Sequence, residues 1–200
     1  MNAAKRSALI LVGMIFLATW VKPPWPCEQA LHSLLTLLAI VALWTYARRR
    51  PIGDANFVLV CVFIAVHAFA ARWLYSFVPY DAWLQNTLGF LLNQAMGWER
   101  NHFDRLVHAL YGVCLTPAVA EYFAGTHSAG RRRSFILALM VIVATGQCYE
   151  WFEWGVALFL APDFAEAFNG QQGDMWDAHK DTLCALAGSL AWTPKYLRRR

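Results

Sequence analysis

Charged residues are scarce in this chain of 200 residues, of which only 15% are Asp, Glu, Lys or Arg. Soluble domains carry about 25% charged and about 45–50% apolar residues, whereas 58% of this sequence is hydrophobic. This balance excludes a disordered chain and an ordinary soluble enzyme. The many apolar residues, which include ten Trp and thirteen Phe, indicate an integral membrane protein that forms one domain over residues 1–200.

The common sequence signatures of catalysis are also missing. The five cysteines form no CxxC pair, which argues against a zinc ribbon or a disulfide framework. The chain contains no HExxH, GxSxG or Walker motif. The function must therefore be argued from the positions of the few polar residues.

Long uncharged runs give the fold class. A helix needs about 20 residues to cross the hydrocarbon core of a bilayer. The sequence predicts an all-α, polytopic bundle of six membrane-spanning helices at 7–21, 29–47, 55–78, 106–123, 134–160 and about 177–197. The uncharged segment at about 82–98 contains several Asn and Gln residues, and we expect an interfacial or re-entrant helix there.

The charge distribution gives the expected orientation. With six spans, twelve of the seventeen Lys and Arg residues fall on the side of the two termini, and eleven of the thirteen acids fall on the opposite half. Lys and Arg concentrate in cytoplasmic loops. The sequence therefore predicts a multi-pass protein of a bacterial inner membrane with both termini in the cytoplasm. The same clustering at the ends of apolar runs argues against a nucleic-acid partner and leaves membrane lipids as the expected surroundings.

Four predicted spans nevertheless carry polar side chains at membrane depth, where a charge costs about 2.5–3.5 kcal/mol on insertion scales. Within each set, residues that are three or four apart should share one helix face, as expected for Arg72 and Tyr75 and for Asp104 and His108. Under the predicted topology all four sets lie in the outer half. The sets are His67, Arg72 and Tyr75; Asp104, Arg105 and His108; Gln147, Glu150 and Glu153; and Asp174, Asp177 and Asp181.

Because lipid cannot satisfy such groups, we expect them to meet in a polar cavity that opens to the periplasmic face. Carboxylates with an imidazole suit a divalent metal such as Zn²⁺, Mg²⁺ or Mn²⁺, which polarises a phosphoryl or acyl oxygen and activates water. The candidate catalytic residues are Asp104, His108, Glu150 and Asp177. The candidate metal ligands are His108, Glu150, Glu153, Asp174, Asp177 and Asp181, and the candidate substrate-binding residues are His67, Arg72, Tyr75 and Arg105.

Two classes of function remain open. The first is a hydrolase or phosphotransferase that acts on an anionic lipid or lipid-linked envelope substrate. The second is a non-enzymatic protein, either a small transporter or a scaffold held by buried salt bridges such as Arg105–Asp181 and Arg72–Glu150. Glu121, the one acid expected in the inner half of a span, either pairs with the arginines at 131–133 or marks an inner gate.

Two stretches carry a family resemblance. Residues 100–108, RNHFDRLVH, and residues 172–181, QGDMWDAHKD, resemble the YjdF-like family of bacterial inner-membrane proteins, as does the EWFE segment that begins at Glu150. The resemblance implies a six-span topology over most of the chain and no particular activity.

A weaker resemblance is to the VanZ-like membrane proteins, which are associated with glycopeptide-antibiotic resistance and the cell envelope. The positions that match are Asp104, Arg105, His108, Glu150, Asp177, Asp181 and Gly188. The sequence departs from that pattern at Glu153, where a Gln is expected, and at Asp181, where an Asn is expected. Carboxylates in place of amides favour metal binding and make a transfer of function less safe.

Overall fold

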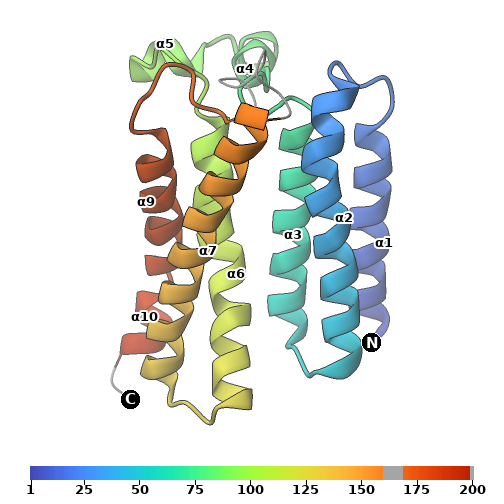
Figure 1. Cartoon of the computed structure of the whole chain (residues 1–200), viewed down its shortest axis with the longest axis vertical. Helices are drawn as coiled ribbons and strands as arrows, with labels where there is room; N and C mark the ends of the chain where they lie inside the picture. The colour runs from blue at the N-terminus through green and yellow to red at the C-terminus, as the bar shows by residue number, and fades with distance from the viewer. Residues whose placement is uncertain (160–168, 199–200) are drawn as a thin grey trace.

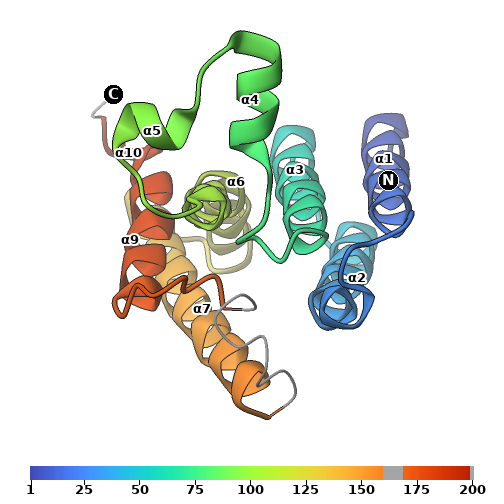
Figure 2. The same ribbon diagram turned by 90° about the horizontal axis from the view of Figure 1, so that it is seen from above.

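Six long helices stand side by side in the computed structural model, which describes residues 1–159 and 169–198 (Figures 1 and 2). The described residues contain helices and no strand. The two termini lie at one end of the bundle, and the two short helices α4 and α5 lie across the other (Figure 1). The helices are α1 (Ala3–Thr19), α2 (Pro26–Arg49), α3 (Asp54–Ala71), α4 (Tyr80–Leu88), α5 (Leu92–Met96), α6 (Phe103–Thr126), α7 (Arg131–Phe159), α9 (Asp177–Leu190) and α10 (Thr193–Leu197).

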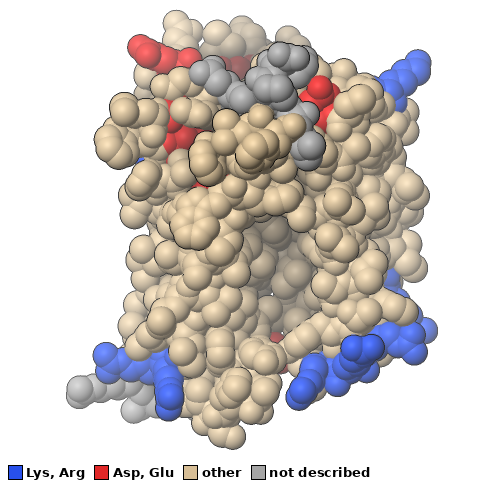
Figure 3. All heavy atoms as spheres, viewed as in Figure 1, with Lys and Arg blue, Asp and Glu red and all other residues tan. Residues whose placement is uncertain are grey.

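Within residues 1–159 and 169–198, four helices are long and apolar enough to cross a membrane, namely α2, α3, α6 and α7. The helix α1 has 17 residues and α9 has 14, so each is shorter than a usual span. Most Lys and Arg side chains surround the end that holds the termini, and acidic side chains gather at the other end (Figure 3). The all-helical membrane fold expected from the sequence is therefore confirmed, with four helices of spanning length in the described part of the chain.

Three predicted boundaries are wrong for identifiable reasons. The third span is predicted to reach residue 78, but α3 ends at Ala71. The helix stops because Leu74 and Tyr75 adopt left-handed backbone conformations with φ of 46° and 56°. The expected helix at 82–98 is two helices, broken at Gly89, which has a φ of 75°. The last predicted span divides into α9 and α10. The end of the fifth predicted span, residue 160, lies outside the described residues.

The helices α6 and α9 approach each other closely at two glycines. A Cβ atom at Gly112 would overlap the Ala185 carbonyl oxygen, and one at Gly188 would overlap the Ala109 carbonyl oxygen. Small residues allow the backbones of membrane helices to approach in this way. A buried hydrogen bond of 2.8 Å from Thr116 Oγ1 to Ser189 Oγ joins the same pair. This crossing brings the acidic start of α9 against the polar start of α6.

A proline inside α6 is compensated from the C-terminal end of the chain. Pro117 has no N–H group, so the carbonyl of Val113 loses its partner within the helix. The indole Nε1 of Trp192, at the junction of α9 and α10, donates to the Val113 carbonyl oxygen at 2.8 Å.

A contact between distant segments of the chain supports the start of α3. The Glu121 carboxylate accepts hydrogen bonds from Gly53 N at 2.7 Å and from Asn56 Nδ2 at 2.6 Å. The expected pairing of Glu121 with residues 131–133 is therefore wrong.

Candidate functional site

Polar side chains from three helices and two loops meet near the end of the bundle that is opposite the termini. Asp104, Arg105 and His108 lie at the start of α6, Glu150 and Glu153 lie late in α7, and Asp177 and Asp181 lie at the start of α9. All of these residues except Arg105, which is partly buried, are buried, and Asp181 has no exposed surface. We call this group, together with Arg100 and Asp174, the polar cluster.

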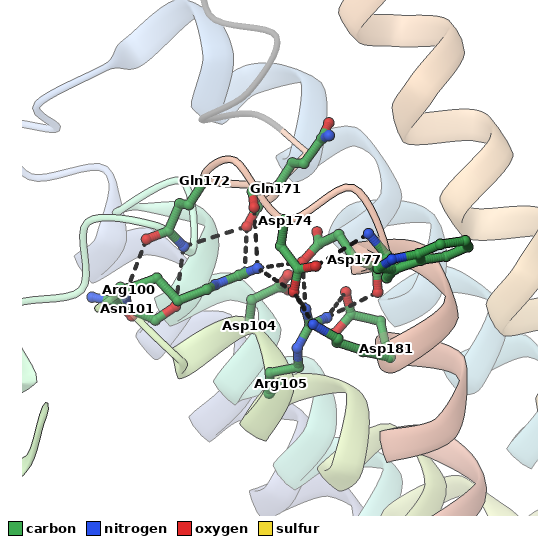
Figure 4. A network of polar contacts seen from close by, with 12 residues as sticks. Arg100, Asn101, Asp104, Arg105, Gln171, Gln172, Asp174, Asp177 and Asp181 are labelled. Atoms are coloured by element: carbon green, nitrogen blue, oxygen red, sulfur yellow. Dashed lines mark hydrogen bonds and ion pairs between the residues drawn. The ribbon is translucent and has the colours of Figure 1, made fainter. Parts of the chain in front are cut away.

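Two guanidinium groups hold one part of the polar cluster (Figure 4). Arg105 Nη2 lies 2.6 Å from Asp177 Oδ1, and its Nη1 lies 2.5 Å from Asp181 Oδ2. Arg100 Nη1 lies 2.6 Å from the same Asp177 oxygen. Asp174 Oδ2 lies 3.1 Å from Arg105 Nη2. We call Arg100, Arg105, Asp174 and Asp177 the arginine side, in which each acid has at least two charged partners.

The loop before α9 is fastened to the start of α6. Arg100 donates to the carbonyl oxygens of Gly170 at 2.6 Å and Gln171 at 3.0 Å. Gln172 and Asn101 exchange two hydrogen bonds, with Asn101 N donating to Gln172 Oε1 at 2.9 Å and Gln172 Nε2 donating to the Asn101 carbonyl at 3.0 Å (Figure 4). These contacts fix the position from which Asp174 and Asp177 enter the polar cluster.

The remaining part of the polar cluster has fewer donors. His108 Nε2 lies 3.5 Å from Asp104 Oδ1 and 3.4 Å from Glu150 Oε1, which is longer than a normal hydrogen bond. Among the described residues, Asp104 Oδ2 and Asp181 Oδ1 are buried without a hydrogen-bond partner. We call Asp104, His108 and Glu150 the histidine side, and Asp181 joins it to the arginine side.

One donor atom from each of Asp104, His108 and Asp181 lies within 4.8 Å of the other two, all three side chains being buried. One imidazole and two carboxylates form a ligand set that suits Zn²⁺ or Mn²⁺. A cavity of about 250 Å³ adjoins this group and is lined by Glu150, Glu153, Asp174 and Asp177 among others. Glu153 is thus buried beside the cavity and is absent from the three-residue group.

Asp174 lies at the aqueous edge of the polar cluster, before the first residue of α9. A hydrogen bond of 2.6 Å from Lys180 lowers the pKa of the Asp174 carboxyl below its ordinary value. The side chain of Lys180 is half exposed. This pair therefore forms the solvated boundary of a group that is otherwise buried.

Of the four residues expected to bind a substrate, three lie in the polar cluster or beside a cavity, and one does not. Arg105 is in the polar cluster, and the Tyr75 hydroxyl lies 2.9 Å from His67 Nδ1 at the edge of a second cavity that His108 also lines. Arg72 lies elsewhere, because its guanidinium donates to the carbonyl oxygens of Thr19 and Lys22 at the end of α1. The expected Arg72–Glu150 pair is wrong, and Tyr75 does not share a helix face with Arg72.

Sequence reasoning missed Arg100 as a member of the site. Its partners lie 70 or more residues away in the chain, so no local spacing reveals them. The ring of Tyr149 was also missed, although it lies 6.4 Å from both His67 and His108 between ring centroids. The only available signal for Tyr149 was its place one residue before Glu150 on the polar face of α7.

Comparison with known proteins places the chain in a family. Inner membrane protein YjdF of Escherichia coli (strain K12) is 29% identical over 155 residues, which cover 77% of this chain and 70% of that protein. No solved structure matches the chain. The inner-membrane relative and the four apolar helices together support a multi-pass inner-membrane protein. The family designated "Predicted membrane protein (DUF2238)" matches residues 4–198, so the chain belongs to this YjdF-like family of membrane proteins.

Proposed function

We propose that the chain is a six-span inner-membrane protein that binds a divalent cation in the outer half of the bilayer and uses it to act on an anionic lipid or lipid-linked substrate. In this topology α1 and the α9–α10 pair also cross the membrane. The basic clusters at the end that holds the termini support a cytoplasmic location for that end. The polar cluster then faces the periplasm.

The observation that carries the proposal is the shortage of donors on the histidine side. Asp104 and Asp181 each bury an oxygen that has no hydrogen-bond partner among the described residues, which is costly for a charged group. A divalent cation between these carboxylates and His108 would remove that cost. Two ligands that each lie about 2.1 Å from a tetrahedral Zn²⁺ are about 3.4 Å apart, close to the His108–Asp104 separation of 3.5 Å.

The residues around such a cation have distinct roles. A bound cation polarises a phosphoryl or acyl oxygen and favours ionisation of a water molecule. Glu150 lies beside His108 and lines the 250 Å³ cavity, so it is placed to take a proton from a nucleophile there. Arg105 keeps Asp177 and Asp181 in place. Both its terminal nitrogens, Nη1 and Nη2, are engaged with acids, so it positions these residues and does not bind substrate.

Metal analysis tests the proposal most directly. Protein purified in detergent and exchanged with Zn²⁺ or Mn²⁺ should hold about one ion per chain, and saturation at about 100 times the dissociation constant should add roughly 2.7 kcal/mol of stability. Asp104→Asn and Asp181→Asn should lose the ion. Glu121→Gln is the matched control, because Glu121 binds only Gly53 and Asn56 in the described structure.

Activity needs a separate measurement. Vesicles that hold phosphatidic acid or a polyprenyl diphosphate, with release of inorganic phosphate as the readout, test phosphoryl chemistry, and turnover should be lost in Glu150→Gln. A wild-type chain that holds no Zn²⁺, Mn²⁺ or Mg²⁺ would contradict the metal site.

A structural scaffold is the second candidate, and the arginine side favours it. Asp177 Oδ1 accepts from two arginines at 2.6 Å each, an arrangement that ties the start of α6 to α9 without any ligand. If no cation binds and substitutions in both parts of the polar cluster only lower stability, the scaffold function is the better account.

A further inference from the structure

A second cavity lies between the two halves of the bundle, below the histidine side. Its volume is about 290 Å³, and it is lined by α2, α3, α6 and α7 together with Tyr75. Figure 3 shows this face of the molecule hollowed between α2 and α7, the helices that flank the hollow in Figure 1. These four helices are the ones that are long and apolar enough to cross a membrane.

The walls of the cavity differ along its length. Leu35 and Ala39 on α2, Phe63 on α3, and Leu115 on α6 make one part apolar. The polar atoms belong to His67, Tyr75, His108, Tyr111, Thr145 and Tyr149. His108 is therefore shared by this apolar cavity and the polar cluster, while Glu150, 3.4 Å from His108, lines the polar cavity on the other side.

An apolar cavity whose lining comes from membrane-spanning helices is surrounded by hydrocarbon. Water has few partners on the apolar walls, and hydrocarbon chains are the molecules present at that depth. Ligand pockets have volumes of about 300–1,000 Å³, so a cavity of about 290 Å³ is at the small end for a bound molecule and leaves room for one hydrocarbon chain at most.

We propose that this cavity holds one hydrocarbon chain of a membrane lipid, which enters between α2 and α7 and brings the lipid head group to His108. The proposed position of the hydrocarbon chain rests on the cavity alone, whereas the role of the head group rests on the function proposed above. The substrate class becomes specific: a lipid whose reacting phosphate or ester lies at the end of a single apolar chain or can separate one chain from the others.

Gly146 gives a way to close the cavity. It is buried on α7 and lines the cavity, and a Cβ atom there would meet only the ring carbon Cε1 of Tyr111, at 4.0 Å. Gly146→Ala therefore fits, whereas Gly146→Leu fills the space. Gly155→Leu is the control on the same helix, because a Cβ atom there meets nothing within 4 Å. Leu35→Trp fills the cavity from the opposite wall.

The experiment uses the full chain in vesicles of phosphatidylethanolamine and phosphatidylglycerol, with a trace of phosphatidylglycerol that carries a diazirine in one acyl chain. After illumination, labelled residues are mapped by mass spectrometry. We expect label on Phe63 and Leu115 in the wild type, reduced roughly tenfold in Gly146→Leu and Leu35→Trp, because lost burial of about two methylene groups changes affinity by that factor. Gly146→Ala and Gly155→Leu should label like the wild type.

Label confined to outward-facing residues such as Leu34 and Met140 would overturn the proposal, as would label on Phe63 that persists in both filled variants. If a filled variant does not fold, as judged by its melting curve, the wild-type map alone decides. Metal content is measured in the same samples. Label in the cavity without bound metal would support the hydrocarbon-chain site and contradict the proposed function. Bound metal without label in the cavity would support the proposed function and contradict the hydrocarbon-chain site.

Discussion

The arginine side and the histidine side of the polar cluster meet at Asp181 and both draw residues from the start of α6, yet they satisfy their charges in opposite ways. On the arginine side, Asp177 binds two arginines at 2.6 Å. On the histidine side, Asp104 has only His108 at 3.5 Å and keeps a buried oxygen without a partner among the described residues. A fully paired group stabilises a fold, whereas a group short of donors is typical of a place where a ligand supplies them.

The largest expected effect comes from Arg105→Met. Removal of this guanidinium leaves Asp177 and Asp181 as buried acids with fewer partners, and breaking a buried pair in this way costs about 3–5 kcal/mol. The free energy of unfolding in detergent micelles measures it. Arg132→Met is the control because Arg132 is exposed, and it should change stability by less than about 0.5 kcal/mol. Equal effects of the two substitutions would refute the structural role of the arginine side.

Asp177→Asn should destabilise the protein by about 1.5–3 kcal/mol, because both arginines lose a charged acceptor. Unfolding measured in the presence of a chelator isolates this effect from any bound metal. If the free energy of unfolding stays the same or rises, the two arginines do not need Asp177. The difference between the two sides of the polar cluster would then disappear.

Asp104→Asn should instead raise the free energy of unfolding in the same chelator-treated samples. Asp104 is buried near Glu150, Asp177 and Asp181 and has no arginine at ion-pair distance among the described residues, so removing its charge relieves repulsion. We expect a gain of about 1 kcal/mol, the usual size for a substitution that trades function for stability. Metal-loaded samples should reverse the order, with the wild type the more stable. A loss of stability without metal would contradict the description of the histidine side.

Lys180→Ala should have the smallest effect, about 0.2–1 kcal/mol, because Lys180 is half exposed and its pair with Asp174 is screened by solvent. The pKa of Asp174 is lowered in the folded protein, so this contribution is complete above the ordinary Asp pKa of about 3.9 and disappears as the pH falls through the lower folded value. Stability measured at neutral pH and below about pH 3 tests it, with Arg132→Ala as the control because Arg132 is exposed.

The polar face of α6 could be predicted from spacing alone. Asp104 and His108 are four residues apart, and the structure has them on one buried face. The start of the last helix at Asp177 was likewise readable from the acids that precede a short apolar run. Periodicity indicates which side chains face inward on one helix, and it carries no information about which residues of another helix they meet.

The errors follow from that limit. The end of α3 depends on left-handed residues that are not glycine, Leu74 and Tyr75, so no residue type marks the turn. By contrast, Gly89 was a readable sign that the segment 82–98 breaks into two helices. Arg72 and Arg100 look equivalent in the sequence, yet one caps α1 and the other fastens the loop before α9, because their partners come from distant parts of the chain.

The hydrogen bond from Trp192 to Val113 has a consequence for biogenesis. Its two residues are 79 positions apart, so the Val113 carbonyl of α6 has no such partner until the junction of α9 and α10 has been synthesised. In hydrocarbon such a group is costly. The helices α1 and α2 both pack against α3, and these three can therefore assemble early, whereas α6 acquires its acidic neighbours and its missing donor only after α9 and α10 have been made.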